Sequence, residues 1–250
     1  MKVEIVLTVS ESKRLIAKGV AGLDFVQEKL SQGVVVLATG STNAYIYEEL
    51  TGQTIDKRAY LTGRTTPAKA TLGWKVGRIP DLVLVDGQPA PQLDRFTALA
   101  RMKAGDVYIK GANALNYAKG LAGVSIGDPS AGTIGGAIGP IVGKKLRLLV
   151  PVGLEKEVPF DIEKASALIA EPDARLGTVH SLFPIRGIIF TEIEALRVLC
   201  SVDAYPVAAG GIAGAEGGLR LLLAGSDQAV QRALDLVTTI QGEPLFGQAT

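Results

Sequence analysis

Residues 34–43, VVVLATGSTN, constrain the fold of this chain more than any other segment. An apolar run typical of a buried strand passes through small residues directly into residues 44–50, which have the pattern of a helix. Such a turn leaves backbone N–H groups free at the positive end of a helix, where a phosphate or carboxylate can bind. We therefore predict an anion site formed by Thr39, Gly40, Ser41 and Thr42. The alternative is that Ser41 or Thr42 only caps the helix.

Charge and composition exclude several classes of partner. The 250 residues include 26 basic and 25 acidic side chains, without a block of like charge, so we expect neither nucleic acid nor a membrane surface as partner. A single cysteine, Cys200, and a single histidine, His180, argue against an internal disulfide and a protein-only transition-metal site. We expect no metal and no cofactor. The absence of a signal-like segment or a long apolar run predicts a cytoplasmic protein.

The N-terminal half alternates between strand and helix patterns. We predict a strand at 3–8, one long helix at 10–30, a helix at 94–103 and buried strands at 82–85 and 107–109. The two later strands end in polar turns, Asp86-Gly87 and Lys110-Gly111-Ala112-Asn113. Ligands of open α/β sheets bind beyond the carboxyl ends of the strands, so we expect these turns to share one crevice with Ser41. Asp-Gly is also an ordinary turn dipeptide, and Lys110 has the alternative of being merely solvated.

The order of these motifs resembles ribose-5-phosphate isomerase A. The matching segments are ATGST at 38–42, VDGQP at 85–89 and KGANAL at 110–115, within a span of about residues 15–115. Glucosamine-6-phosphate deaminases, coenzyme A transferases and the sugar-sensing domains of some repressors share this fold. The resemblance implies a proton-transfer or hydroxyl-binding role for Asp86. It also implies ligand contacts from Gly87, Lys110, Gly111 and Asn113.

The chain departs from the isomerase pattern at the base. No glutamate occurs between Gln53 and Leu154, although abstraction of a proton next to a carbonyl needs a base within hydrogen-bond reach. We therefore expect a protein that binds a small anionic metabolite, such as a sugar phosphate, with isomerase-like activity open. The alternative is a non-catalytic metabolite-binding or sensor protein. A coenzyme A transferase is disfavoured by the missing nucleophilic glutamate, and a homodimer or higher homo-oligomer is compatible with either interpretation.

Three further features have both a functional and a structural interpretation, and a fourth, Cys200, has a structural one only. The glycine-rich residues 127–140 can wrap a phosphate, or form an ordered loop or helix packed near the crevice. Arg64 can clamp an anion through two hydrogen bonds, or be solvated. His180 can be a general acid or base, although a structural role is favoured, and Cys200 is interpreted as a core residue.

The C-terminal part has a different element order. Strands at 187–190, 204–209 and 219–223 with helices at 191–200 and 226–240 predict a β-α-β-β-α unit. We predict an α/β protein with a Rossmann-like, open, mostly parallel sheet in residues 1–183 and a small ferredoxin-like α+β domain in residues 184–250. Glu192 and Glu216 are candidates for the missing carboxylate if the segment 208–218 faces the crevice.

Overall fold

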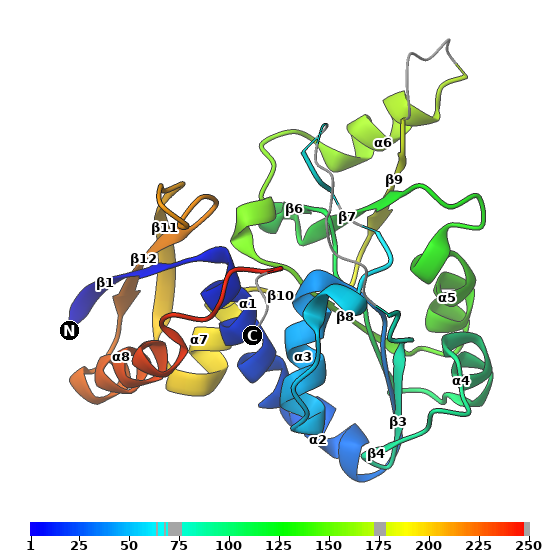
Figure 1. Cartoon of the computed structure of the whole chain (residues 1–250), viewed down its shortest axis with the longest axis horizontal. Coiled ribbons are helices and arrows are strands. Elements are labelled where there is room, and N and C mark those ends of the chain that lie inside the picture. The colour runs from blue at the N-terminus through cyan, green and yellow to red at the C-terminus, as the bar shows by residue number, and fades with distance from the viewer. Residues whose placement is uncertain (64, 68, 70–76, 173–178, 248–250) are drawn as a thin grey trace.

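The computed structural model describes residues 1–63, 65–67, 69, 77–172 and 179–247, which form a mixed α/β structure (Figure 1). Its eight described helices are α1 Val9–Ala21, α2 Asp24–Ser31, α3 Ser41–Thr51, α4 Arg95–Arg101, α5 Gly132–Gly143, α6 Ile162–Ala170, α7 Glu192–Cys200 and α8 Asp227–Ile240. The strands are β1 Lys2–Leu7, β2 Val34–Leu37, β3 Leu82–Val85, β4 Gln88–Pro89, β5 Val107–Ile109, β6 Ala114–Asn116, β7 Leu121–Ile126, β8 Arg147–Pro151, β9 Ser181–Ile185, β10 Ile188–Phe190, β11 Asp203–Ala209 and β12 Leu219–Ala224.

The largest sheet has six strands in the order β10-β8-β5-β2-β3-β4. Strands β10, β8, β5 and β2 run parallel to one another, whereas β3 is antiparallel to β2 and β4 is antiparallel to β3. The carboxyl ends of β2, β5 and β8 therefore meet at one edge of the sheet. Leu82, the first residue of β3, pairs with Leu37, the last residue of β2, so β3 ends at the opposite edge.

Helices cover both faces of this sheet (Figure 1), with α1, α3 and α7 on one side and α4 and α5 on the other. The apolar faces of the helices explain the arrangement, because Leu15 and Ile16 of α1 and Ile46 of α3 have no exposed surface, like Val36 and Leu37 of β2. Burial on both faces also explains why the β2 segment is a continuous apolar run rather than an alternating one. The packing of helices against both faces thus fixes the position of the sheet edge at which β2, β5 and β8 end.

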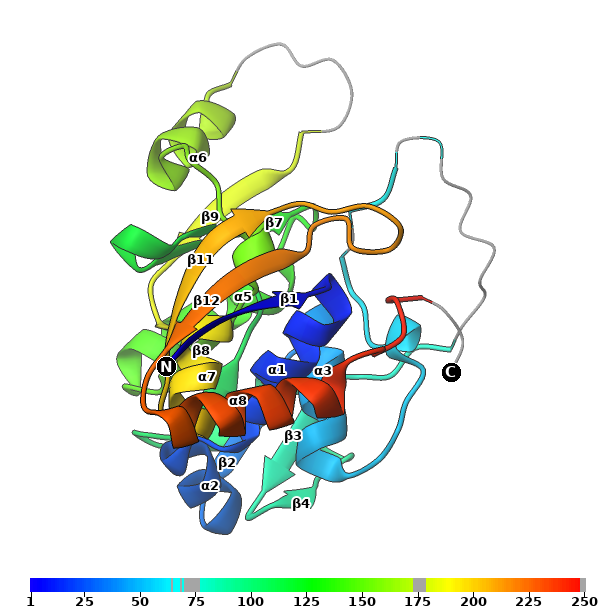
Figure 2. The same ribbon diagram turned by 90° about the vertical axis from the view of Figure 1, so that its left-hand side faces the viewer.

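Two smaller antiparallel sheets flank the large one. Strand β1 lies beside β12 in the sheet β1-β12-β11, and α8 lies below this sheet in the view of Figure 2. The other sheet has the order β6-β7-β9 and carries α6. Strands pair across the predicted boundary between residues 183 and 184. Strand β1, before the boundary, pairs with β12, and strand β10, after it, pairs with β8. The division into two domains stays a prediction.

The sequence located most elements but missed a helix break. The predicted helix at 10–30 is wrong, since α1 ends at Ala21 and α2 begins at Asp24. Gly22 caps α1 by donating its N–H to the Lys18 carbonyl, and Leu23 is extended. The apolar spacing continues across the break because both helices bury a face against the same core. The predicted C-terminal strands and helices are confirmed, with bounds that differ by one or two residues at most. The interpretation of Cys200 as a core residue is also confirmed, because its side chain is buried.

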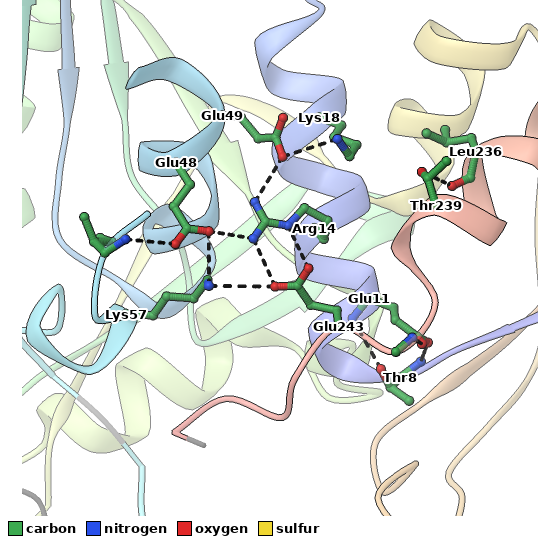
Figure 3. Close-up of polar contacts among 12 residues, drawn as sticks. Thr8, Glu11, Arg14, Lys18, Glu48, Glu49, Lys57, Leu236, Thr239 and Glu243 are labelled. Atoms are coloured by element: carbon green, nitrogen blue, oxygen red, sulfur yellow. Dashed lines mark hydrogen bonds and ion pairs between the residues drawn. The ribbon is translucent and has the colours of Figure 1, made fainter. Parts of the chain in front are cut away.

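The C-terminal segment after α8 is attached to α1 and α3 by an ion network (Figure 3). The Arg14 guanidinium donates to Glu48 at 2.6 Å, Glu49 at 3.0 Å and Glu243 at 2.9 Å, and the Lys57 ammonium lies 3.1 Å from Glu48. Burial lowers the pKa of Arg14, but the hydrogen bonds to Glu243 and Glu48 outweigh this effect and raise the pKa above its ordinary value. Each charge in this network therefore has a partner of opposite sign.

Candidate functional site

A cavity of about 440 Å³ opens at the carboxyl edge of the six-stranded sheet, between the start of α3, the turn after β5, strand β7 and the start of α5. Seven of the predicted ligand-binding residues line it. They are Thr39, Gly40, Ser41, Thr42, Lys110, Gly111 and Asn113. The structure thus brings together the turn after β2 and the turn after β5. The glycine-rich segment before α5 forms another part of the cavity wall.

No side chain of the described residues caps the N-terminus of α3. Its N-cap residue is Gly40, and the first helical hydrogen bond runs from the Ala44 N–H to the Gly40 carbonyl. The amides of the first turn have no acceptor within the helix. By contrast, a threonine hydroxyl and a glutamate close capping boxes at α1 and α7. The interpretation of Ser41 or Thr42 as a mere cap is therefore wrong.

Thr42 and Asn43 carry buried polar atoms at this helix end. Thr42 is 2% exposed, and neither its Oγ1 nor the Asn43 Oδ1 has a hydrogen-bond partner among the described residues. The Asn43 side-chain amide donates to the Ala38 carbonyl at 2.7 Å, which fixes the side chain at the end of β2. An unsatisfied buried hydroxyl costs about 1–3 kcal/mol unless a ligand completes its hydrogen bonds.

Two lysines line the cavity, and no described residue forms an ion pair with either of them. The ammonium of Lys110, at the end of β5, donates to the Gly111 carbonyl at 2.7 Å, and that of Lys156 donates to the Ala112 carbonyl at 2.9 Å. Neither forms an ion pair within the described part of the chain, and the nearby Asp81 is already paired with Arg95 at 2.6 Å. Burial, and then the charge of Lys156, lower the pKa of Lys110 to about 8.

The opposite wall comes from the segment that leads into α5. The Asp128 carboxylate accepts hydrogen bonds from the Ser130 N–H at 2.8 Å and the Gly132 N–H at 3.4 Å, so α5 already has an anion at its start. The Tyr108 hydroxyl donates to the Thr133 carbonyl at 2.6 Å and connects α5 to β5. The prediction of a glycine-rich helix near the crevice is confirmed. The His180 side chain lines the same wall.

A second group of buried charges lies behind the cavity. Lys13 of α1 is 7% exposed, and burial, with a further contribution from the charge of Lys156, lowers its pKa to about 8. Glu192, at the start of α7, is fully buried, and burial together with the charge of Glu155 raises its pKa to about 7. One Glu192 oxygen accepts from the Leu154 N–H at 3.0 Å. Glu192 is thus an interior carboxyl rather than one on a loop that faces the cavity.

Asp86 and Gly87 lie at the other edge of the sheet, and the expectation that they share the crevice with Ser41 is wrong. The reason is the direction of β3, which runs antiparallel to β2. The Asp86 carboxylate accepts a hydrogen bond from the Gly33 N–H at 2.8 Å. The backbone angle φ is positive at Asp86, 48°, and at Gly87, 74°. A Cβ on Gly87 would lie 2.7 Å from the Leu30 carbonyl oxygen, so this turn requires glycine.

The remaining candidates occupy other places. Arg64 lies outside the described residues. The Glu216 carboxylate accepts from the Gly214 N–H at 2.9 Å in the β11–β12 hairpin and is not part of the cavity wall. Sequence reasoning missed Lys156, although a signal existed. The apolar run at 146–152 is followed by Gly153-Leu154-Glu155-Lys156, and the rule that ligands bind beyond strand ends applies to this run as well.

Comparisons with protein-family models, curated proteins and solved structures found no match for this chain. None of the helices in the described residues is long and apolar enough to cross a membrane.

Proposed function

We propose that the cavity binds a small phosphorylated metabolite, with a sugar phosphate as the first candidate. One observation carries the proposal: within the described residues, the start of α3 has no side-chain cap and the Thr42 hydroxyl has no partner, and they share a cavity with two lysines for which the same residues provide no counterion. A phosphate group offers negative charge and several acceptor oxygens, which suit backbone amides, a hydroxyl and an ammonium together. Cavities of this volume are in the usual range for small ligands.

The sugar part of the proposal rests on the motif order. The four parallel strands support a Rossmann-like description of the large sheet. The smaller α+β unit, which we describe as ferredoxin-like, would consist of β1, β11, β12, α7 and α8. Ligands of such sheets bind at the carboxyl ends of the strands. The similarity to ribose-5-phosphate isomerase A adds sugar phosphates as the substrate class.

A non-catalytic metabolite-binding protein is the second candidate. Proton transfer in an isomerase needs a free base at the ligand, but Asp86 lies at the opposite edge of the sheet. Asp128, a carboxylate of the described cavity wall, is engaged at the start of α5. These placements favour binding over isomerase-like proton abstraction by a carboxylate.

A thermal-melt comparison of ribose 5-phosphate with ribose, in phosphate-free buffer, tests the proposal. A ligand at about a hundred times its dissociation constant stabilises by about 2.7 kcal/mol, which is a shift of about 5–10 °C for a chain of this size. We expect ribose 5-phosphate and inorganic phosphate to raise the melting temperature, and ribose to leave it unchanged.

The variant Lys156→Met should lose most of this shift, because it removes a cation from the cavity. The exposed Lys2 of β1 provides the matched control, and Lys2→Met should keep the shift. Equal shifts in both variants, or no shift with any phosphate compound, would contradict the proposed function.

A further inference from the structure

The Lys110 amine has an environment unlike that of an ordinary surface lysine. It is 8% exposed, it lies at the wall of the cavity, and its one hydrogen bond within the described residues goes to the neighbouring Gly111 carbonyl. The charge that acts on it most strongly is the positive charge of Lys156. An ammonium that is desolvated and faces another cation loses its proton more readily than one in water.

The consequence is a larger population of neutral amine near physiological pH. With its pKa lowered to about 8 by burial and then by Lys156, about a fifth of Lys110 is neutral at pH 7.4, against about a thousandth for a solvated lysine. The neutral amine is the form that attacks a carbonyl carbon, and desolvation beside a second cation is a known way to activate a lysine. The lysine is also held by the rigid end of β5 rather than by a loop tip.

We propose that Lys110 forms an imine with the carbonyl carbon of a phosphorylated aldehyde or ketone whose phosphate occupies the N-terminus of α3. This proposal rests on the proposed function for the position of the phosphate. The α3 amides, the Thr42 hydroxyl and the Lys156 ammonium hold the phosphate, which leaves Lys110 for the carbonyl end of the same molecule. Both subsites belong to one cavity of about 440 Å³.

The reaction is a reversible condensation that needs no further reactant. The lone pair of the Lys110 nitrogen adds to the carbonyl carbon while the C=O π electrons move to oxygen, which takes up a proton. The nitrogen then loses a proton to give the carbinolamine. Its hydroxyl takes up a second proton from water and leaves as one water while the nitrogen lone pair forms the C=N bond, and the iminium nitrogen returns that proton to water when the neutral imine forms. The imine draws electrons from the adjacent carbon and thereby weakens its C–H and C–C bonds. Such a protein would act on phosphorylated carbonyl compounds without using Asp86.

Borohydride trapping with a matched pair of aldehydes tests the proposal. The protein is incubated with D-glyceraldehyde 3-phosphate or D-glyceraldehyde in phosphate-free buffer and reduced, and the modified lysines are mapped by mass spectrometry. We expect the phosphorylated aldehyde to label Lys110 at least tenfold more than any other lysine and at least tenfold more than glyceraldehyde does. Inorganic phosphate should suppress the labelling.

Variants separate this step from phosphate binding. Lys110→Arg should abolish the dominant adduct. Thr42→Val should reduce labelling of Lys110 severalfold with the phosphorylated aldehyde but not with glyceraldehyde. Lys2→Arg, the control, should leave labelling of Lys110 by either aldehyde unchanged. Labelling spread over the exposed lysines would overturn the imine proposal, while a phosphate-dependent melting shift would still support the proposed function. Equal labelling of Lys110 by the two aldehydes would place the phosphate elsewhere. That result would overturn both the two-subsite arrangement and the proposed function.

Discussion

The two ends of α3 differ in how their charges and polar groups are satisfied. Near its C-terminus, Glu48 and Glu49 enter the ion network of Arg14, where carboxylates and cations alternate at distances of 2.6–3.5 Å (Figure 3). At its N-terminus, Thr42 lines a cavity whose lysines, Lys110 and Lys156, form no ion pair with any carboxylate of the described residues. Paired charges can be explained by stability alone, whereas unpaired buried groups cost stability and call for a ligand. This difference is the reason why we propose the N-terminal end of α3, and not its C-terminal end, as the ligand-binding one.

The largest effect should come from breaking the paired region. Arg14→Met leaves Glu48 and Glu243 without their main partner, and because the Arg14 side chain is only 13% exposed we expect a loss of about 3 kcal/mol in the free energy of unfolding. Urea unfolding measures it. Arg186→Met is the control, because that side chain is 65% exposed beside Glu163 and its loss should stay within about 0.5 kcal/mol. Equal effects of the two variants would remove the contrast between the regions.

Glu192 should make stability depend on pH in a direction opposite to that of an ordinary paired carboxylate. Burial and Glu155 raise its pKa to about 7, so the folded protein retains this proton between pH 4.5 and 7 while the unfolded chain releases it. The contribution of Glu192 is therefore fully present below pH 4.5 and is lost by pH 7, a change of about 3 kcal/mol. Ser12 and Lys13 of α1 belong to the same interior region.

Urea unfolding of the wild-type protein and Glu192→Gln from pH 5 to pH 8 measures this effect. The stability of the variant relative to the wild type should rise up to about pH 7 and stay level above it. Glu163→Gln, at an exposed position of α6, should run parallel to the wild type throughout. Parallel curves for Glu192→Gln as well would show that this carboxyl is solvated in the folded protein.

Removal of an unpaired lysine should stabilise the protein, in contrast to removal of a paired one. The pKa of Lys110 is lowered to about 8, so its buried charge costs stability below pH 8, and this cost disappears as pH rises to 10.5. We expect Lys110→Met to increase the free energy of unfolding by about 2 kcal/mol at pH 7, and by little at pH 10.5. Lys57→Met, which removes a partner of Glu48, should be destabilising. A loss of stability in both variants would mean that Lys110 has an unrecognised counterion.

The smallest effect concerns a single hydroxyl. Thr42→Val keeps the shape of the side chain and removes a buried oxygen that has no partner among the described residues, so the free energy of unfolding should rise by about 1 kcal/mol. Affinity for inorganic phosphate should fall about tenfold, equivalent to about 1.4 kcal/mol, in calorimetric titration. Thr51→Val at the other end of α3 removes a hydroxyl that donates to the Tyr47 carbonyl, so it should reduce stability and leave phosphate affinity unchanged. The reverse pattern would contradict the assignment of the two helix ends.

The sequence was sufficient for local structure because its apolar periodicity is strong. The run at 82–85 predicted β3 to the residue, and the apolar run that begins at Val34 predicted a strand where β2 lies. The same runs carry no information about direction, since a strand buried on both faces has the same composition either way. Strand direction, set by pairing between segments 44 residues apart, decided that Asp86 lies away from Ser41. That is why the candidate site was predicted in part only.

Residues outside simple motifs were harder to predict. Lys156 follows β8 in a short helical turn, Leu154–Lys156, and its position in the cavity depends on how β8 pairs with β5. The sheet β6-β7-β9 brings segments from residues 114–126 and 181–185 together, which no periodicity within either segment indicates. Helix α6 and strands β6 and β9 were missed because they are short and are held by tertiary contacts.

Backbone amide chemical shifts during a phosphate titration measure whether the start of α3 binds an anion. The ¹H–¹⁵N resonances of Ser41, Thr42 and Asn43 report whether an anion accepts hydrogen bonds at the start of α3. We predict saturable downfield shifts of these amides in the wild-type protein, and much smaller ones in Lys156→Met at the same phosphate concentration. Unchanged resonances for these three residues, or shifts confined to other helix ends, would contradict the account.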